Sequence, residues 1–155
     1  MKAIGQSASI KDFKDFNYIY IDKTEQIYSL LGQRRVFFSR PRRFGKSLVL
    51  DTIATLFEQG VEPYFKDTWI YDKWPQKTYP VLRLNFLDFG NDSLEKFTIK
   101  FNNYVCEFAK ELQLEHDVVG IDPAETLLKL CNALKDKKIV ILIDEYDCQL
   151  TANIN

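Results

Sequence analysis

The chain has little of what marks a secreted, membrane-bound or strongly charged protein. Its 155 residues include three cysteines and one histidine, and 21 Lys and Arg nearly balance 22 Asp and Glu. A net charge of −1 gives no global reason to expect nucleic acid or an anionic membrane as partner. No apolar run approaches a membrane span, and residues 1–10 lack the apolar stretch of a signal peptide. We therefore expect a cytoplasmic protein.

The scarcity of cysteine and histidine also limits the chemistry. Cys106, Cys131 and Cys148 are an odd number without paired spacing, and two of them fall on apolar helix faces. We interpret all three as reduced and structural. The single histidine, His116, stands in a polar stretch, where an imidazole is more often a surface group than a metal ligand or a base.

The chain has enough hydrophobic residues to form a buried core. Hydrophobic residues make up 46% and aromatic residues 14%, which suffices for one folded domain of this length. The sequence contains no internal repeat, no low-complexity tract and no linker-like segment. We therefore place no domain boundary inside residues 1–155.

A phosphate-binding loop is indicated where the sequence reads Gly45-Lys46-Ser47. These residues follow the apolar run 36–39, which is typical of a strand, and precede a helical pattern that starts at Leu48. Such a loop needs a residue without a side chain so that backbone N–H groups can surround phosphate oxygens, then a cation, then a hydroxyl for magnesium. The positive end of the following helix adds to the attraction.

The loop departs from the common pattern G-x-x-x-x-G-K-[ST] at its first position. Arg40 stands where the first glycine is expected, and arginine does not easily adopt a positive φ. Pro41 fixes its own φ and biases Arg40 toward an extended backbone, which could preform the turn differently. The predicted nucleotide-binding stretch consists of Arg40, Pro41, Arg42, Arg43, Phe44, Gly45, Lys46, Ser47 and Leu48.

A second motif follows an unbroken aliphatic run. Residues 139–143 predict a buried parallel strand, and acidic residues come directly after it. Ligands of open α/β sheets bind outside the carboxyl ends of strands, so this strand and the one before the phosphate loop can face a single nucleotide. Asp144 and Ser47 are then the candidate magnesium ligands. Glu145, which would polarise the attacking water, and Lys46 are the candidate catalytic residues.

Positive charge gathers around the loop although the whole chain is nearly neutral. A polyphosphate is one reason for such a concentration, and a nucleic-acid backbone is the competing one. The residues concerned are Arg34, Arg35, Arg40, Arg42, Arg43 and Lys46.

Periodicity and capping signals predict the remaining elements. Tyr18 and Tyr20 precede the first strand and are candidates to cover an adenine ring. The aromatic-rich stretch 64–74 favours a packing flap over a base-stacking platform. Helices are expected over 24–31, from Leu48 to Gly60, from Asp92 or Ser93 to Leu112, and from Asp122 to Leu134, with a strand over 81–86.

Four stretches together carry a family resemblance: 20–24 (Tyr-Ile-Asp-Lys-Thr), 40–48, 80–86 and 143–147. With these in order, the chain closely resembles the bacterial AAA-ATPase-like family over nearly its whole length. The family likewise replaces the first Walker A glycine, which implies that Arg40 is a family feature. The resemblance implies an α/β fold, a P-loop NTPase of the additional-strand, AAA-like class, built as a three-layer sandwich around a parallel sheet.

In that class the sheet order is 5-1-4-3-2, and the acidic Walker B strand is strand 3 in chain order. No candidate sequence for strands 4 and 5 follows Asp147, so we expect residues 1–155 to be the N-terminal part of the P-loop domain. Nor is there a later arginine finger, a group worth about 10³–10⁵ in rate in other nucleotidases. We expect weak or absent hydrolysis by this chain alone. Longer family members often add a PD-(D/E)XK nuclease-like domain, a candidate partner that this chain lacks.

Three functional hypotheses remain open at this point. The first is an ATP-binding module of a Mg²⁺-dependent ATPase. The second is a non-catalytic fragment whose basic loop and strand edges serve self-association, association with another chain, or nucleic-acid binding, with steep salt dependence on DNA. The third is a phosphotransferase, since Gly-Lys-Ser loops also serve kinases, although no acceptor site can be identified in the sequence.

Overall fold

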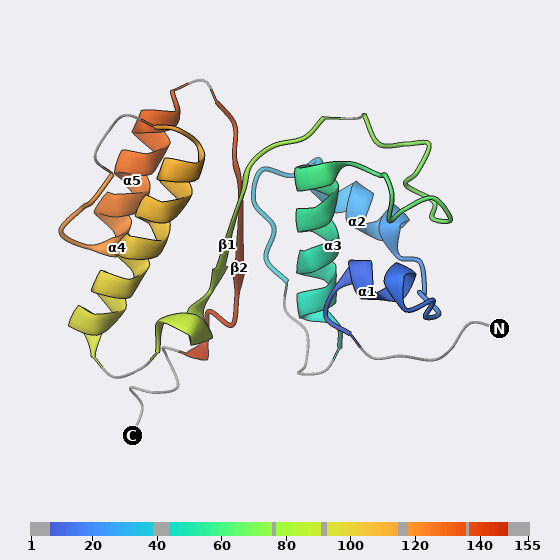
Figure 1. The fold of residues 1–155 in the computed structure, drawn as a ribbon, viewed down its shortest axis with the longest axis horizontal. Coiled ribbons are helices and arrows are strands. Elements are labelled where there is room, and N and C mark those ends of the chain that lie inside the picture. The colour runs from blue at the N-terminus through green and yellow to red at the C-terminus, as the bar shows by residue number, and fades with distance from the viewer. Residues whose placement is uncertain are drawn as a thin grey trace. The chain divides into compact units, whose positions relative to one another are not determined.

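The computed structural model describes residues 7–38, 44–75, 77–90, 93–114, 118–135 and 137–148. The chain divides into two compact units, Met1–Tyr79 and Pro80–Asn155, each described here by itself (Figure 1). The predictions for His116 and for residues 39–43 lie outside the described residues. Helices and a small parallel sheet make up the described part, which is compatible with the predicted α/β class.

The described residues of the first unit form three helices. The sequence did not predict α1 (Ile10–Asp15), whose N-cap Ser9 accepts the N–H of Lys11. The prediction for α2 (Thr24–Leu31) is confirmed, and Gly32 follows it as C-cap. The next helix, α3 (Lys46–Gln59), ends before Gly60 as predicted but begins two residues before Leu48.

The predicted strand before the phosphate loop is not formed within the described residues. Residues 35–38 have no strand assignment, and Val36 and Phe37 are 42% and 71% exposed. A strand exists only by ladder pairing with a neighbour, and the two-stranded sheet of the described part does not include these residues. An apolar run therefore indicates a strand only where a neighbouring strand pairs with it.

The turns after α3 bury two of their aromatic residues, Phe65 and Trp74. Phe65 and Ile70 are fully buried, and Trp74 is nearly so. Trp74 meets Phe57 of α3 edge-to-face, with 5.1 Å between ring centroids. Trp69 remains 39% exposed. The packing role predicted for this stretch is thus confirmed for Phe65 and Trp74.

Asp22 and Thr24 connect the start of α2 to these turns. One carboxylate oxygen of Asp22 accepts the N–H and the hydroxyl of Thr24, at 2.8 and 2.7 Å. The other accepts the N–H of Trp69, at 2.6 Å. The Thr24 oxygen, fully buried, in turn accepts the N–H of Ile70. The stretch 20–24, which contributed to the family resemblance, therefore has a structural role at Asp22 and Thr24.

In the described residues of the second unit there are a parallel sheet and two long helices. In Figure 1, α4 and α5 lie side by side on one face of the sheet. The two strands of the sheet pair in register from Val81 with Val140 to Asn85 with Asp144. This pairing agrees with the sheet order 5-1-4-3-2 that the resemblance implies, in which strands 2 and 3 are neighbours. The elements are β1 (Val81–Asn85), η1 (Phe86–Phe89), α4 (Leu94–Glu111), α5 (Pro123–Leu134) and β2 (Val140–Asp144).

Both helices of this unit begin at the caps that the sequence predicts. Ser93 accepts the N–H of Lys96, and Asp122 accepts the N–H of Glu125 at 2.8 Å. The Glu125 carboxylate also accepts the N–H of Ile121, the residue before the cap Asp122. The helices pack on the sheet through Leu82, Leu84, Phe89, Phe101, Val105, Ala109, Val118, Leu130 and Leu134.

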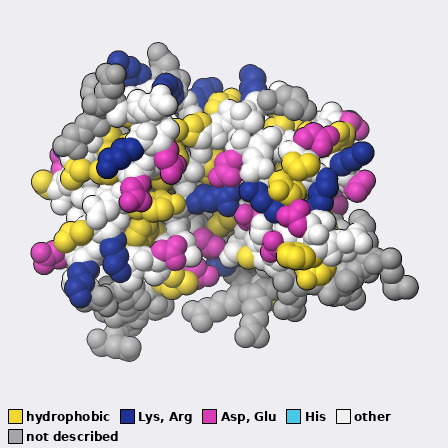
Figure 2. Space-filling view, in the orientation of Figure 1, with side chains coloured by type: hydrophobic (Ala, Val, Ile, Leu, Met, Phe, Trp, Pro, Cys, Tyr) yellow, Lys and Arg dark blue, Asp and Glu magenta, His cyan; other side chains and the backbone are white. Residues whose placement is uncertain are grey.

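The surface is mixed in charge, and the cysteines differ in burial. Lys and Arg side chains lie among Asp and Glu side chains on the face shown in Figure 2. None of the three cysteines forms a disulfide, but Cys131 is exposed, contrary to the predicted burial on an apolar helix face. The apolar stripe of α5 instead runs through Thr126, Leu130 and Leu134. None of the helices in the described ranges has the length and apolar character needed to cross a membrane.

Candidate functional site

The residue before α3 has the backbone conformation that calls for glycine. Gly45 has φ 72° and ψ 26°, in the left-handed region, and its carbonyl oxygen accepts the N–H of Val49 at 3.0 Å. A Cβ built at Gly45 would meet no atom within 4 Å. Conformation rather than space therefore explains this glycine.

Lys46 and Ser47 are the first two residues of α3, and both are partly exposed. The first N–H groups of a helix have no intrahelical partner, and the helix dipole places partial positive charge at that end. The first turn of α3 contains no acidic residue to neutralise that charge. An arriving anion would meet backbone donors and the ammonium group of Lys46 together.

The body of α3 is anchored in its unit, which fixes the direction of this end. The carboxylate of Asp51 accepts the N–H of Ile10, at the start of α1, at 2.8 Å. Thr52 donates its hydroxyl proton to the carbonyl of Leu48 at 2.7 Å. The helix face at Thr52, Ile53, Ala54, Thr55 and Leu56 is buried.

The other predicted loop residues divide into two groups. Phe44 is 65% exposed and Leu48 is partly buried, and their part in nucleotide binding stays a prediction. Arg40, Pro41, Arg42 and Arg43 lie outside the described residues, and their roles stay predictions.

The acidic motif lies at the carboxyl end of β2. Asp144 is the last residue of that strand, and its carboxylate accepts the N–H of Glu145 at 3.0 Å. Glu145 has φ 51°, a left-handed conformation that ends the strand abruptly. The carbonyl of Glu145 accepts the N–H of Cys148, so a turn follows at once. Both acidic side chains are partly exposed.

Asn85 is a neighbour that the sequence analysis did not single out. It ends β1 directly beside Asp144 in the parallel register. Its side-chain oxygen accepts the N–H of Leu87 at 3.2 Å and so caps η1. A polar residue at the end of the strand 81–86 was the available signal, because the carboxyl ends of parallel strands meet at one edge.

The donor types present suit a magnesium nucleotide. Mg²⁺ prefers hard oxygen ligands, keeps several waters, and is bound by one or two carboxylates together with substrate phosphates. The hydroxyl of Ser47 and the carboxylate of Asp144 are ligands of that kind. Within the described residues no three His, Cys, Asp or Glu side chains cluster as a metal cage, and a phosphate-bound Mg²⁺ does not require one. Ser47 and Asp144 belong to separate units, so their pairing stays a prediction.

Comparisons with known proteins add the following. A family profile described as "Predicted AAA-ATPase" matches residues 6–155. The chain is 33% identical over 157 residues to a protein of Azotobacter chroococcum mcd 1 named "Uncharacterized protein in vnfD 5'region". That similarity covers 95% of this chain and 28% of the relative, so the chain spans less than a third of the relative's length. No solved structure matches the chain.

Proposed function

The chain belongs to the AAA-ATPase-like family of predicted AAA-ATPases, and from this premise we propose that it binds ATP with Mg²⁺ as part of a P-loop ATPase. The observation that carries the proposal is the left-handed Gly45 immediately before Lys46 and Ser47 at the start of α3. This arrangement brings backbone donors, a cation and a hydroxyl together on consecutive residues at the start of one helix.

Each residue of the site has a defined part in the proposal. The amides around Gly45 and the ammonium of Lys46 hold the β- and γ-phosphates. Ser47 and Asp144 hold the cation, which when bound neutralises phosphate charge. Glu145 orients and polarises the water that attacks the γ-phosphate, and Asn85 lies at the same edge as Asp144.

Turnover by this chain is proposed to be weak. Phosphoryl transfer depends on charge that stabilises the γ-phosphate in the transition state, and an arginine finger there is worth about 10³–10⁵ in rate. The site residues described above include one such cation, Lys46. Binding rather than hydrolysis is therefore the property to measure first.

Titration of the full chain with a fluorescent ATP analogue, with and without Mg²⁺, tests the proposal. Saturable binding that Mg²⁺ strengthens is the expected result. Lys46→Ala should weaken it at least about tenfold, because hydrogen bonds to charged groups are worth about 1.5–3 kcal/mol. The matched control is Lys77→Ala, at an exposed lysine of the same unit.

The outcomes separate the competing hypotheses. Equal binding by wild type and Lys46→Ala would contradict the assignment of the phosphate site. Binding that ignores Mg²⁺, and a DNA affinity that falls steeply with salt, would instead favour the non-catalytic interaction hypothesis.

A further inference from the structure

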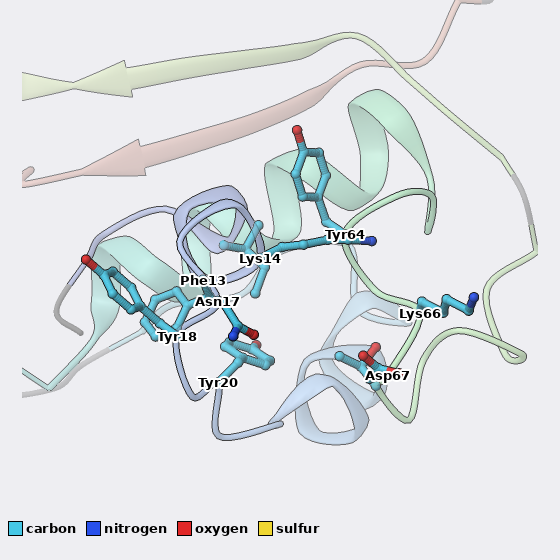
Figure 3. A pocket seen from close by; sticks show the side chains of 10 residues that line it. Phe13, Lys14, Asn17, Tyr18, Tyr20, Tyr64, Lys66 and Asp67 are labelled. Carbon is cyan, nitrogen blue, oxygen red and sulfur yellow. The ribbon is translucent and has the colours of Figure 1, made fainter. Parts of the chain in front are cut away.

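A pocket of about 320 Å³ opens in the first unit between α1, residues 17–20 and the turn residues 64–68 (Figure 3). None of the described phosphate-loop residues, 44–48, lines it. Four aromatic side chains contribute to its wall, together with an amide and lysine side chains. The residues that line the pocket include Phe13, Asn17, Tyr18, Tyr20, Tyr64 and Lys66.

The aromatic wall is held in a fixed arrangement. Phe13 contacts Tyr18 at 6.2 Å and Tyr20 at 5.6 Å between ring centroids, with interplanar angles of 83° and 70°. Edge-to-face contacts set these rings at steep angles, so their flat faces are not stacked against one another. All three side chains are partly buried and line the opening. A planar ring entering the pocket finds rigid surfaces to stack on.

Asn17 adds a group suited to the edge of such a ring. It has φ 54°, and its N–H donates to the carbonyl of Lys14 at 3.1 Å, which closes the turn after α1. Its side chain is exposed and lines the pocket. An amide offers one acceptor and two donors, which matches the ring nitrogens and exocyclic groups of a nucleobase.

The pocket is connected to the helix that carries the phosphate site. Ile10, which also lines the pocket, donates its N–H to Asp51 of α3. The side chain of Tyr20 lies near that of Thr52. Asp51 and Thr52 lie five and six positions after Lys46, so at 1.5 Å per residue they are about 8–9 Å along the helix axis. A ribose and a phosphate chain are of this order of length.

The character of the wall selects among ligands. A wholly apolar ligand would take Lys14, Asn17, Lys66 and Asp67 out of water without replacing their hydrogen bonds, which is unfavourable. A base with its ribose offers both a flat face for the rings and polar edges for these groups.

We propose that this pocket receives the base of the nucleotide whose phosphates bind at the start of α3, with Tyr18 stacking on the base and Asn17 bonding its edge. The inference rests on the proposed function. It assigns base recognition to residues 13–20 and 64–68, at a distance from the Gly-Lys-Ser loop.

Calorimetric titration of the full chain with Mg-ATP and with Mg-tripolyphosphate tests this, because tripolyphosphate has no base. Tyr18→Ala and Asn17→Gly should each weaken ATP binding about tenfold, the size of one base–aromatic stack or base-edge bond, and leave tripolyphosphate binding unchanged. Glycine suits the left-handed backbone at position 17. Tyr71→Ala, at a tyrosine of the same unit that does not line the pocket, is the control for both ligands.

Retained tripolyphosphate binding also shows that each variant is folded. Unchanged ATP binding in both variants, or equal weakening of both ligands, would overturn the base pocket while leaving the phosphate site in place. A wild-type chain that binds neither ligand would overturn the proposed function itself, and the base pocket with it.

Discussion

Asp22 accepts a hydrogen bond from the N–H of Trp69, 2.6 Å away and 47 positions further along the chain. Since the same carboxylate also holds Thr24, one side chain joins the start of α2 to the turns after α3. Tyr18 and Tyr20 of the proposed base pocket lie just before this connection, and Thr68 of its wall lies just before Trp69. The shape of the pocket therefore depends on Asp22 and Thr24.

Thr24→Val tests this connection. Valine has the shape of threonine but cannot accept the N–H of Ile70 or donate to Asp22. A buried donor without a partner costs about 1–3 kcal/mol, so the free energy of unfolding should fall by about that amount in urea titrations. Thr78→Val, at an exposed threonine of the same unit, should change it by less than about 0.5 kcal/mol. Equal effects of the two substitutions would remove the structural role assigned to Thr24.

A glycine pair tests the backbone of the phosphate site. Gly45→Ala puts a Cβ on a left-handed residue, which costs about 1–2 kcal/mol, although no neighbour obstructs it. Relaxation of that strain should turn the amides away from the phosphates and weaken Mg-ATP binding. Gly32→Ala is the matched control, because Gly32 has φ −71° and equally open surroundings. It should keep ATP binding and slightly raise stability. The same ATP affinity in both variants would show that the conformation of Gly45 does not matter for binding.

The elements predicted best from the sequence are those specified by nearby residues. The caps Ser93 and Asp122 act within three positions of themselves, and α4, α5 and both strands of the sheet lie close to their predicted ranges. The six-residue α1 offers too short a period to detect, and Asp51, 41 positions away, binds its first N–H. The run 36–38 matches a strand in composition, but strand formation depends on a partner that composition does not reveal.

In the candidate site, too, the residues specified by local sequence were predicted, and those that depend on distant contacts were missed. Local sequence was enough to place Gly45 before a helix and Asp144 at a strand end. Asn85 was missed because its importance comes from the pairing of β1 with β2, a contact across 59 positions. The proposed base pocket combines α1 with turns more than 40 positions away, and aromatic content by itself does not distinguish a pocket wall from a core.

Position 120 requires glycine because the surrounding atoms leave no room for a side chain. A Cβ there would lie 2.5 Å from the backbone nitrogen of Thr126 and 2.8 Å from the carbonyl carbon of Glu125. Its own N–H and carbonyl bond to Thr126 and Asn102, which also bond to each other. Gly120→Ala should therefore displace the start of α5 and lower the free energy of unfolding by about 1–3 kcal/mol. Thermal melts followed by circular dichroism give the comparison, with Ile121→Ala, at a side chain 89% exposed, as control. A melting temperature unchanged by Gly120→Ala would contradict the close packing seen there.

Stability at alkaline pH should report on Tyr20. Burial raises the pKa of Tyr20 above its usual 10.0; the charge of Asp22 acts in the same direction, and a hydrogen bond with Thr52 acts against it. The folded state therefore favours the neutral phenol. This contribution is fully present below about pH 10, where the unfolded phenol ionises, and is lost as pH rises through the folded pKa.

Urea titrations between about pH 9 and pH 11 measure that loss. The free energy of unfolding of the wild type should fall more steeply with pH than that of Tyr20→Phe, which has no phenol to ionise at that position. Tyr28→Phe, a change on the outer face of α2, should retain the wild-type slope. Parallel curves for the wild type and Tyr20→Phe would rule out a burial effect on Tyr20.

The two acids at the end of β2 should separate metal binding from water activation. Asp144→Asn keeps a side-chain oxygen that can accept the N–H of Glu145, so the turn after the strand is expected to survive. It removes the negative charge that Mg²⁺ prefers in a ligand. The gain in ATP affinity on adding Mg²⁺ should fall about tenfold, the lower end of what loss of a metal-site partner costs. The ATP affinity in the presence of EDTA should stay at the wild-type value.

Glu145→Gln is the matched control, because the proposed partner of Glu145 is a water and not the metal. This variant should keep the Mg²⁺ effect on ATP binding and lose whatever phosphate release the wild type shows. If the Mg²⁺ effect survives Asp144→Asn and disappears in Glu145→Gln, then Glu145 and not Asp144 binds the metal. If the Mg²⁺ effect survives in both variants, the end of β2 is not part of the nucleotide site.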